Sequence, residues 1–274
     1  MAEVVSSFEL IFKPQSPADP DDGGPVATVI QGYFLSISNL EDEDYTYSLR
    51  FIIADPGDPN RTLENNTLVI IDSPAGVPAD NRFTRLRSSD GKRFFPASGA
   101  FTVPAHGTAL VAVLPQVFGP VPGDDTPLAG PDFEVRGYVE IRLPALFGRS
   151  NDSPFGRFVQ QAQSDGPVRV LLTPQYRASY LDADGAITDQ TQATVPLAGG
   201  AGVVQIDPDR PFTKFPFEDF VPRLPVGLIE ELDEREKSAL LATLLGNIDA
   251  ADALKSVNDM LKTIESPITL KKDG

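Results

Sequence analysis

Cysteine is absent from this chain of 274 residues. Disulfide bonds, thiolate metal sites and cysteine nucleophiles are therefore excluded, and the absence fits a protein of a reducing cytoplasm. Tryptophan is also absent, so no sugar-binding site in this chain stacks an indole ring on its ligand. Histidine occurs once, at His106, and this number excludes a histidine-rich metal site.

Long apolar runs and targeting features are lacking as well. No segment approaches the roughly 20 apolar residues that a membrane-spanning helix needs, so we expect no membrane span. The first residues, MAEVVSSFELIF, carry no basic start, no long apolar stretch and no small-residue cleavage site. This pattern predicts a protein without a signal peptide, located in the cytoplasm, with signal-independent export left open.

Positive charge is scarce. The chain has 23 Lys and Arg residues against 39 Asp and Glu residues, which gives a net charge of −16. Such a field repels nucleic acid and anionic membranes, so we expect neither as a partner. It favours solubility, cations and basic proteins. The abundance of Arg, Ala, Pro, Gly, Val and Asp suggests a GC-rich bacterial genome.

Short strands dominate the sequence up to about residue 225, separated by many of the 26 Pro and 22 Gly residues. Apolar residues alternate most clearly in 27–38 and 45–53, on either side of an acidic turn at 41–44. Further strands are predicted at 8–13, 67–71, 82–86, 100–103, 108–114, 133–143, 168–181, 187–195 and 203–206. This spacing predicts a mainly β fold, an immunoglobulin-like or jelly-roll β-sandwich, with a barrel left open.

The predicted domain organisation has three parts. A β-sandwich body covers 1–207, with a possible subdivision near 115–131, and a Phe/Pro-rich linker arm covers 208–229. A helical tail covers 230–274. Two long loops interrupt the body at 115–131 and 144–166, and a short helix is possible at 155–163 within the second loop.

The linker arm is rich in phenylalanine. Pro211, Pro216 and Pro222 disfavour helix within it and hold it extended. Exposing four phenylalanine side chains to water is unfavourable, because each has a large apolar surface. The arm therefore either closes an open end of the sandwich or inserts into another subunit.

The helical tail reads as two amphipathic helices that form a hairpin. The first begins with the capping-box pattern at 233–236 and ends at Gly246, and the second ends before Pro267. Helices of about four turns are marginal alone in water, so their apolar faces must pack on this body, on another copy or on a foreign partner. The predicted interaction residues of the arm and tail are Phe212, Phe215, Phe217, Phe220, Leu240, Leu244, Leu254, Val257, Leu261 and Ile264.

No catalytic signature accompanies this architecture. The chain lacks a nucleophile-elbow motif, a P-loop and a dinucleotide fingerprint. His106 is expected in a tight turn between two strands. Glu134 and Glu140 share a strand face, but about 20 Å would separate them, which is too far for a glycosidase pair. We therefore predict no catalytic residue, no cofactor and no enzyme, with a carboxylate-based hydrolase left open.

Acidic loops are candidate calcium sites, because calcium prefers several oxygen ligands from a flexible loop. The candidates Asp182, Asp184 and Asp189 partly match a calcium-binding loop, but Tyr180 stands where the first acidic ligand belongs. The same residues also fit a hairpin turn with Gly185 at positive φ, which is the interpretation we favour. We predict no metal site and keep these three aspartates as weak candidates.

The function predicted from these patterns is that of a non-enzymatic structural or protein-interaction subunit. It would self-assemble as a homo-oligomer, or dock another protein, through the arm and the helices. The alternative is a carbohydrate- or calcium-binding sandwich module that uses the acidic loops and the tyrosines. These tyrosines are Tyr33, Tyr45, Tyr47, Tyr138, Tyr176 and Tyr180.

Overall fold

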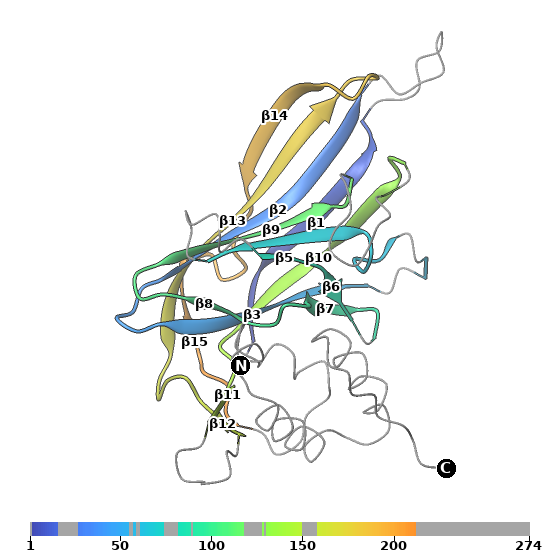
Figure 1. Ribbon diagram of the computed structural model, residues 1–274. Helices are drawn as coiled ribbons and strands as arrows, with labels where there is room; N and C mark the ends of the chain where they lie inside the picture. The colour runs from blue at the N-terminus through green and yellow to red at the C-terminus, as the bar shows by residue number, and fades with distance from the viewer. Residues whose placement is uncertain are drawn as a thin grey trace, which may run out of the picture.

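The computed structural model describes residues 2–15, 27–54, 57–58, 61–73, 82–88, 90–117, 128, 130–149 and 158–211. The described residues form antiparallel strands joined by turns (Figure 1). The strands are β1 (Glu3–Pro14), β2 (Thr28–Asn39), β3 (Tyr45–Ile53), β4 (Thr67–Asp72), β5 (Arg82–Thr84), β6 (Leu86–Arg87), β7 (Arg93–Pro96), β8 (Phe101–Val103), β9 (Thr108–Pro115), β10 (Phe133–Arg142), β11 (Leu146–Arg149), β12 (Phe158–Gln161), β13 (Val168–Leu181), β14 (Ile187–Thr194) and β15 (Val203–Ile206).

Thirteen of these strands belong to one sheet. Its main path runs β5-β4-β9-β2-β1-β10-β3-β7-β6; β13 joins at β2, β14 and β15 join at β13, and β8 joins at β3. The prediction of a mainly β fold is confirmed, as a nearly closed antiparallel sheet. Strands on both sides of 115–131 contribute to this sheet and to one hydrophobic core.

The remaining two strands, β11 and β12, pair with each other. The short helix considered for 155–163 is wrong where the structure describes it, because 158–161 is strand β12. The prediction of a loop over 144–166 is wrong at β11 and β12, and β7 is a further strand that the sequence did not predict.

Strand β2 changes partner halfway along its length. Residues 28–31 pair with β1, whereas residues 33–38 pair with β9. On its other side, β2 pairs with β13 over the whole range 28–39. The change falls at Gly32, where a Cβ atom would lie 2.3 Å from Leu114 Cδ2 and 3.0 Å from the Val113 carbonyl oxygen. The sheet therefore divides at Gly32 into a β1 branch and a β9 branch.

The hydrophobic core lies between these two branches. Phe8 of β1, Tyr33 of β2 and Phe51 of β3 meet edge to face, with ring centroids 5.5 to 6.4 Å apart. The main chain of Tyr33 pairs with β9 and not with β1. Its ring contacts with Phe8 and Phe51 therefore join the β9 branch to the β1 branch. The Tyr33 hydroxyl also shares a 2.8 Å hydrogen bond with Ser6 Oγ. Such aromatic contacts add specific geometry to the burial of large apolar surface.

Gly137 explains how β10 fits between its neighbours. It lies opposite Phe8 on β1, and a Cβ atom there would lie 2.0 Å from the Ile52 carbonyl oxygen. The same atom would come within 2.8 Å of the Phe8 ring. A glycine in the middle of this strand thus permits a close approach that no other residue allows.

Pro174 divides the outer edge of β13 between two strands. Before it, residues 168–171 pair with β15; after it, residues 175–181 pair with β14. The Val195 N–H donates to the Pro174 carbonyl oxygen at 3.0 Å, but proline has no N–H to return to β14. The chain therefore leaves the ladder here and bridges to β1, where the Ala198 N–H donates to the Val5 carbonyl oxygen at 2.8 Å.

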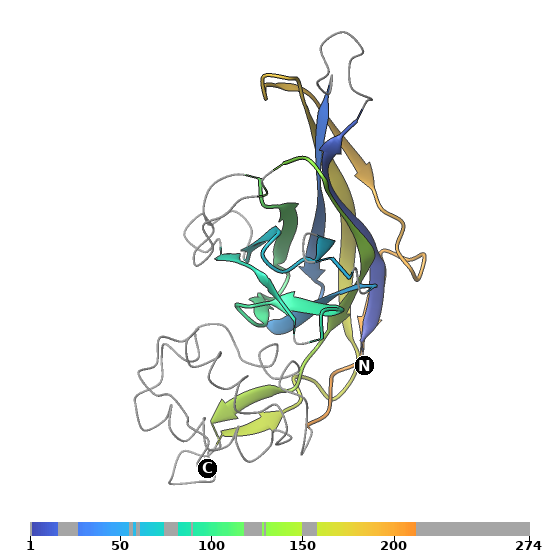
Figure 2. The same cartoon turned by 90° about the vertical axis from the view of Figure 1, so that its right-hand side faces the viewer.

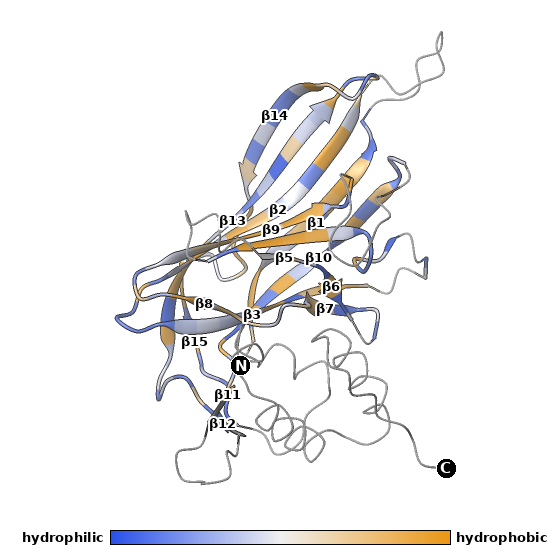
Figure 3. Cartoon of the chain, viewed as in Figure 1, coloured by the Kyte–Doolittle hydropathy of each residue, from blue (hydrophilic) through white to orange (hydrophobic). Residues whose placement is uncertain are grey.

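The β13–β14 hairpin extends beyond the body of the molecule. In two perpendicular views, β13 and β14, together with the paired ends of β2 and β1, reach well past the other strands (Figures 1 and 2). Every residue of β14 is exposed, and hydropathy colouring is mostly pale or blue along the hairpin (Figure 3). The apolar side chains concentrate at the other end, where the two branches face each other. The hairpin is therefore a single layer that the body anchors.

The predicted arm from Phe212 onward and the helical tail lie outside the described residues, so both stay predictions. Within the described ranges, no helix is both long enough and apolar enough to cross a bilayer.

Two buried tyrosines give a matched test of the core. The Tyr47 hydroxyl has no hydrogen-bond partner among the described residues, whereas the Tyr33 hydroxyl bonds Ser6. We expect Tyr47→Phe to leave the free energy of unfolding unchanged or to raise it by up to about 1 kcal/mol. Tyr33→Phe should lower it by about 1 to 2 kcal/mol, because Ser6 loses its partner. Urea unfolding checks both values, and a greater loss for Tyr47→Phe than for Tyr33→Phe would contradict the assignment.

Candidate functional site

The residues predicted for interaction all lie in the arm and the tail, outside the described residues. The structure therefore neither brings them together nor separates them, and the prediction stands as it was made. They are Phe212, Phe215, Phe217, Phe220, Leu240, Leu244, Leu254, Val257, Leu261 and Ile264.

The weak calcium candidates lie at the tip and along the second strand of the β13–β14 hairpin. Gly185 adopts φ of 81°, and the carboxylate of Asp182 accepts from the N–H groups of Asp184 and Ala186 at 3.0 and 2.8 Å. The hairpin interpretation of this turn is thus confirmed. Asp189 lies on β14, and its carboxylate accepts from the Gln190 N–H at 2.8 Å. Among the described residues no group of three or more acidic or histidine side chains is placed to hold a metal ion.

The tyrosines considered for ligand binding divide between the core and the surface. Tyr33, Tyr45 and Tyr47 are buried in the core, so they offer no surface to a ligand. Tyr138 is exposed, while Tyr176 and Tyr180 are half-buried near the base and the tip of the hairpin. The set therefore forms no continuous binding surface.

A charged cluster surrounds a shallow cavity beside β1 and β10. This cavity of about 510 Å³ is lined by Lys13, Pro14, Arg61, Pro131, Asp132, Glu134 and Arg136. Lys13 pairs with Glu134, and Arg136 pairs with both Glu134 and Glu9. The hydrogen bond from Lys13 lowers the pKa of Glu134, and the bond to Glu9 raises the pKa of Arg136. The lining has three basic and two acidic side chains, and Glu9, which pairs with Arg136, brings the acidic groups to three, so the cluster as a whole offers no excess charge to a ligand.

The carboxylate pair considered for hydrolysis is not assembled. Glu134 belongs to the charged cluster, whereas Glu140 lies farther along β10, opposite Val4 on β1 and Arg50 on β3. The two carboxylates therefore lie at different positions along β10 and have different neighbours.

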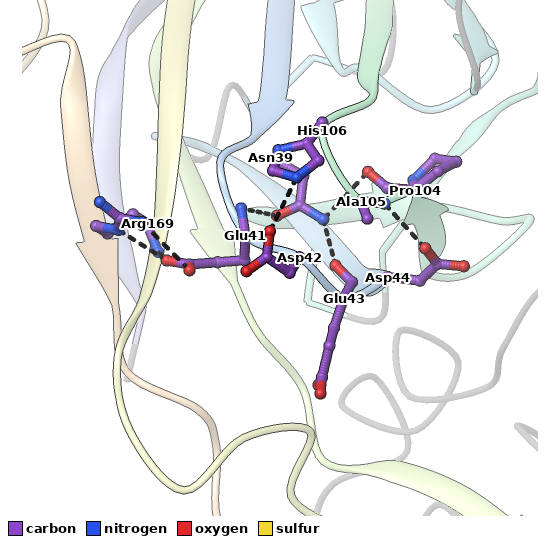
Figure 4. A network of polar contacts seen from close by, with 9 residues as sticks. All are labelled: Asn39, Glu41, Asp42, Glu43, Asp44, Pro104, Ala105, His106 and Arg169. Carbon is purple, nitrogen blue, oxygen red and sulfur yellow. Dashed lines mark hydrogen bonds and ion pairs between the residues drawn. The ribbon is translucent and has the colours of Figure 1, made fainter.

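Asn39 organises the acidic turn between β2 and β3 (Figure 4). Its buried amide donates to the carbonyl oxygens of Glu43, Val103 and Pro104 at 2.7, 3.2 and 3.1 Å. Its amide oxygen accepts from the Glu41 N–H at 3.1 Å. One side chain therefore ties this turn to the turn between β8 and β9.

The acidic residues of this turn reach neighbouring segments (Figure 4). Arg169 of β13 donates to Glu41 at 2.9 Å, and this hydrogen bond lowers the pKa of the carboxyl. Asp44 accepts from the Ala105 N–H at 2.9 Å. His106 lies in the expected tight turn, at φ of 56°, with Nε2 3.0 Å from Asp42. These side chains are used to join turns, and their arrangement has a structural role.

The outer edge of β14 is the feature that the structure leaves most open. Because the Val195 N–H bonds Pro174, the alternation of an antiparallel pair directs the main-chain groups of Thr191 and Ala193 toward β13. The main-chain groups of Gln190, Gln192 and Thr194 then point to the opposite side. No described strand pairs with that side. We call these outward-facing main-chain groups the β14 edge.

The β14 edge differs from the other edges of the sheet. Four other strands of this sheet pair with one neighbour each, and they are short: β5, β6, β8 and β15 have three, two, three and four residues. Such short strands limit unwanted pairing. β14 has eight residues and contains no proline or lysine. Its one charged residue is Asp189. Natural edges are commonly protected by prolines, lysines or bulges. The one irregularity in the pairing of β14 lies near its start, between Asp189 and Ile187, so residues 189–194 remain available for strand addition.

Contacts on β13 hold the hairpin in place. The Arg177 guanidinium lies 4.4 Å from the centre of the Phe34 ring, and the Tyr176 ring meets Tyr33 at 6.4 Å. Gln190 Nε2 donates to Ser179 Oγ at 3.2 Å, which links β14 to β13 through side chains. The β14 edge is thus carried by an anchored element. Sequence reasoning predicted the strand but not its open edge, because neighbours decide which edge stays open.

A substitution at Asn39 tests the structural role of the acidic turn. We expect Asn39→Ala to lower the free energy of unfolding by about 2 to 4 kcal/mol, because several main-chain groups lose a buried partner. The matched control is Asp42→Asn, which alters an exposed contact with His106 and should therefore have a much smaller effect. Urea unfolding measures both. Equal effects of the two substitutions would contradict the role of Asn39.

Three surfaces thus combine polar groups in different ways. In the charged cluster and in the acidic turn, polar side chains find partners within the fold, whereas the main-chain groups of the β14 edge have no strand partner in the described part of the chain. No protein-family model, curated protein or solved structure matches this chain.

Proposed function

We propose that this chain is a non-enzymatic structural or protein-interaction subunit. The observation that supports it is the β14 edge, an eight-residue strand that is exposed throughout and paired on one side among the described residues. Strand addition to such an edge is a recurring mode of protein recognition, in which main-chain hydrogen bonds provide affinity. The subunit would therefore bind protein through an extended sheet.

The C-terminal segment is the second surface in this proposal. Its support is the sequence pattern of a phenylalanine-rich arm followed by two short amphipathic helices. Such helices need a surface to cover, either on this chain or on a partner. We propose that the arm and the helical hairpin dock on another copy or on another protein.

The finer description of fold and location belongs to the same proposal. An immunoglobulin-like or jelly-roll sandwich is supported by the aromatic contacts that join the two branches of the sheet across the core. A bacterial, cytoplasmic origin is supported by the residue usage and by the absence of cysteine. With a net charge of −16, protein is a better partner than nucleic acid.

The alternative, a carbohydrate- or calcium-binding module, has less support. Three of its tyrosines are core residues, and the carboxylate of Asp182 already accepts two hydrogen bonds within its own turn. Heat on titration with calcium, together with a higher melting temperature, would revive the calcium version.

The mass of the protein in solution tests the proposed function. We expect light scattering to give the full chain a mass greater than one subunit, and a chain ending at Gly227 a smaller average mass. This result follows if the arm and tail cover a neighbouring molecule. A full chain that stays monomeric, with residues 230–265 resistant to proteolysis, would show instead that the tail packs on its own body.

A further inference from the structure

We propose that the β14 edge pairs with the β14 edge of a second copy of this chain. The two strands run antiparallel about a two-fold axis at Thr191, so that the sheet continues from one molecule into the other. This inference rests on the proposed function and names its partner. The structure supports it through the backbone alternation, the charges and the side chains of β14.

The backbone alternation of β14 allows such a self-pairing. An antiparallel ladder needs the outward main-chain groups of one strand opposite those of the other. With Thr191 on the axis, Gln190 of each copy faces Gln192 of the second copy, and both have outward main-chain groups. These two pairs provide about four main-chain hydrogen bonds, and they lie within residues 189–194, where the pairing of β14 with β13 is regular.

Charge selects the antiparallel arrangement. In the antiparallel arrangement, Asp189 lies opposite Ala193 of the second copy. The tip of the hairpin, with Asp182 and Asp184, lies toward the uncharged segment 195–200 of that copy. A parallel arrangement would bring Asp189 of one copy beside Asp189 of the other, and one hairpin tip beside the other. Like charges directly opposite each other destabilise a strand pair. Because each chain carries a net charge of −16, we expect salt to strengthen the association.

Side-chain chemistry favours a second copy over a charged foreign strand. Glutamine and threonine both donate and accept hydrogen bonds, so a strand composed mainly of them is complementary to itself. On the axis, Thr191 faces Thr191, a favourable cross-strand pair. A strand built for a basic partner would carry several carboxylates, and β14 carries only Asp189.

Asp189 opposes the pairing and gives the proposal a control. Its carboxylate accepts from the outward Gln190 N–H at 2.8 Å, so pairing must exchange this bond for one to the second copy. The association is therefore expected to be weak and adjustable. Asp189→Ala frees this N–H and removes the charge, so it should lower the dimer dissociation constant at least about threefold.

The absence of cysteine makes a direct test possible in the full chain. Thr191 forms a non-hydrogen-bonded pair across the axis, where about 4.5 Å between Cα atoms permits a disulfide bond. We expect Thr191→Cys to form mostly cross-linked dimer on mild oxidation, as seen on a non-reducing gel. The matched control is Val203→Cys on β15, which is also exposed but lies off the axis. Cross-linking of Thr191→Cys no greater than that of the control would overturn the proposal.

Edge substitutions give a second readout, by analytical ultracentrifugation of the full chain. Gln192→Pro removes an outward N–H and leaves the ladder to β13 intact, and Gln192→Lys serves if the proline variant does not fold. We expect either one to raise the dimer dissociation constant at least about tenfold, with an unchanged melting temperature. Raising the salt from about 0.05 M to about 0.5 M should lower this constant in the unaltered chain.

The outcomes separate this inference from the proposed function. Oligomers that persist unchanged in Gln192→Pro and Gln192→Lys, without cross-linking through Thr191→Cys, would overturn the β14 pairing and leave assembly through another surface. Loss of the oligomer in the edge variants supports the β14 pairing, whatever the tail contributes. A full chain that is monomeric at every concentration and salt, and gives no cross-link, would overturn both self-pairing and self-assembly.

Discussion

A β-strand has two edges, and the way β2 uses its edges determines the rest of this structure. One edge is occupied by β13 along the whole strand. The other is shared, with β1 on one side of Gly32 and β9 on the other. Two strands cannot occupy the same edge, so the β1 and β9 branches must separate at Gly32. The space between them is filled by Phe8, Tyr33 and Phe51, and this aromatic group fixes the distance between the branches.

The same division accounts for the exposed hairpin. Where the sheet is double, side chains from both branches are buried in one hydrophobic core. Beyond the division the sheet is single, so β14 gains no second layer and has only exposed, mainly polar side chains. A two-stranded ribbon alone is marginal in water. Here it is held by its long pairing with β2 and by contacts such as Arg177 over Phe34. The hairpin is therefore stabilised through β13, and β14 needs no strand on its outer edge.

Local chemistry was readable from the sequence, and partner choice was not. The alternation in 45–53 predicted β3, and the Asp-Gly pair with Gly185 at positive φ predicted the hairpin turn. A period of two tells which side chains share a face, but any strand with the right face could pair with β2. The change of partner at Gly32 therefore left no readable pattern, and neither did the bonds of Asn39 to segments more than sixty residues away. β7 was missed because its four residues, ending in proline, are too short to show alternation.

The β14 edge is the candidate site because many polar side chains elsewhere in the described residues pair with one another. Several described acidic groups that suggested ligand binding or hydrolysis have partners within the fold: Glu41 binds Arg169, Asp182 accepts hydrogen bonds within its own turn, and Glu134 pairs with Lys13. Along the edge of β14, by contrast, main-chain groups have no strand partner among the described residues. Main-chain groups are the same in every residue, so a strand that binds through them needs no special side chain and has no sequence motif. Recognition by strand addition is therefore visible in the strand pairing of a structure, and the sequence alone does not reveal it.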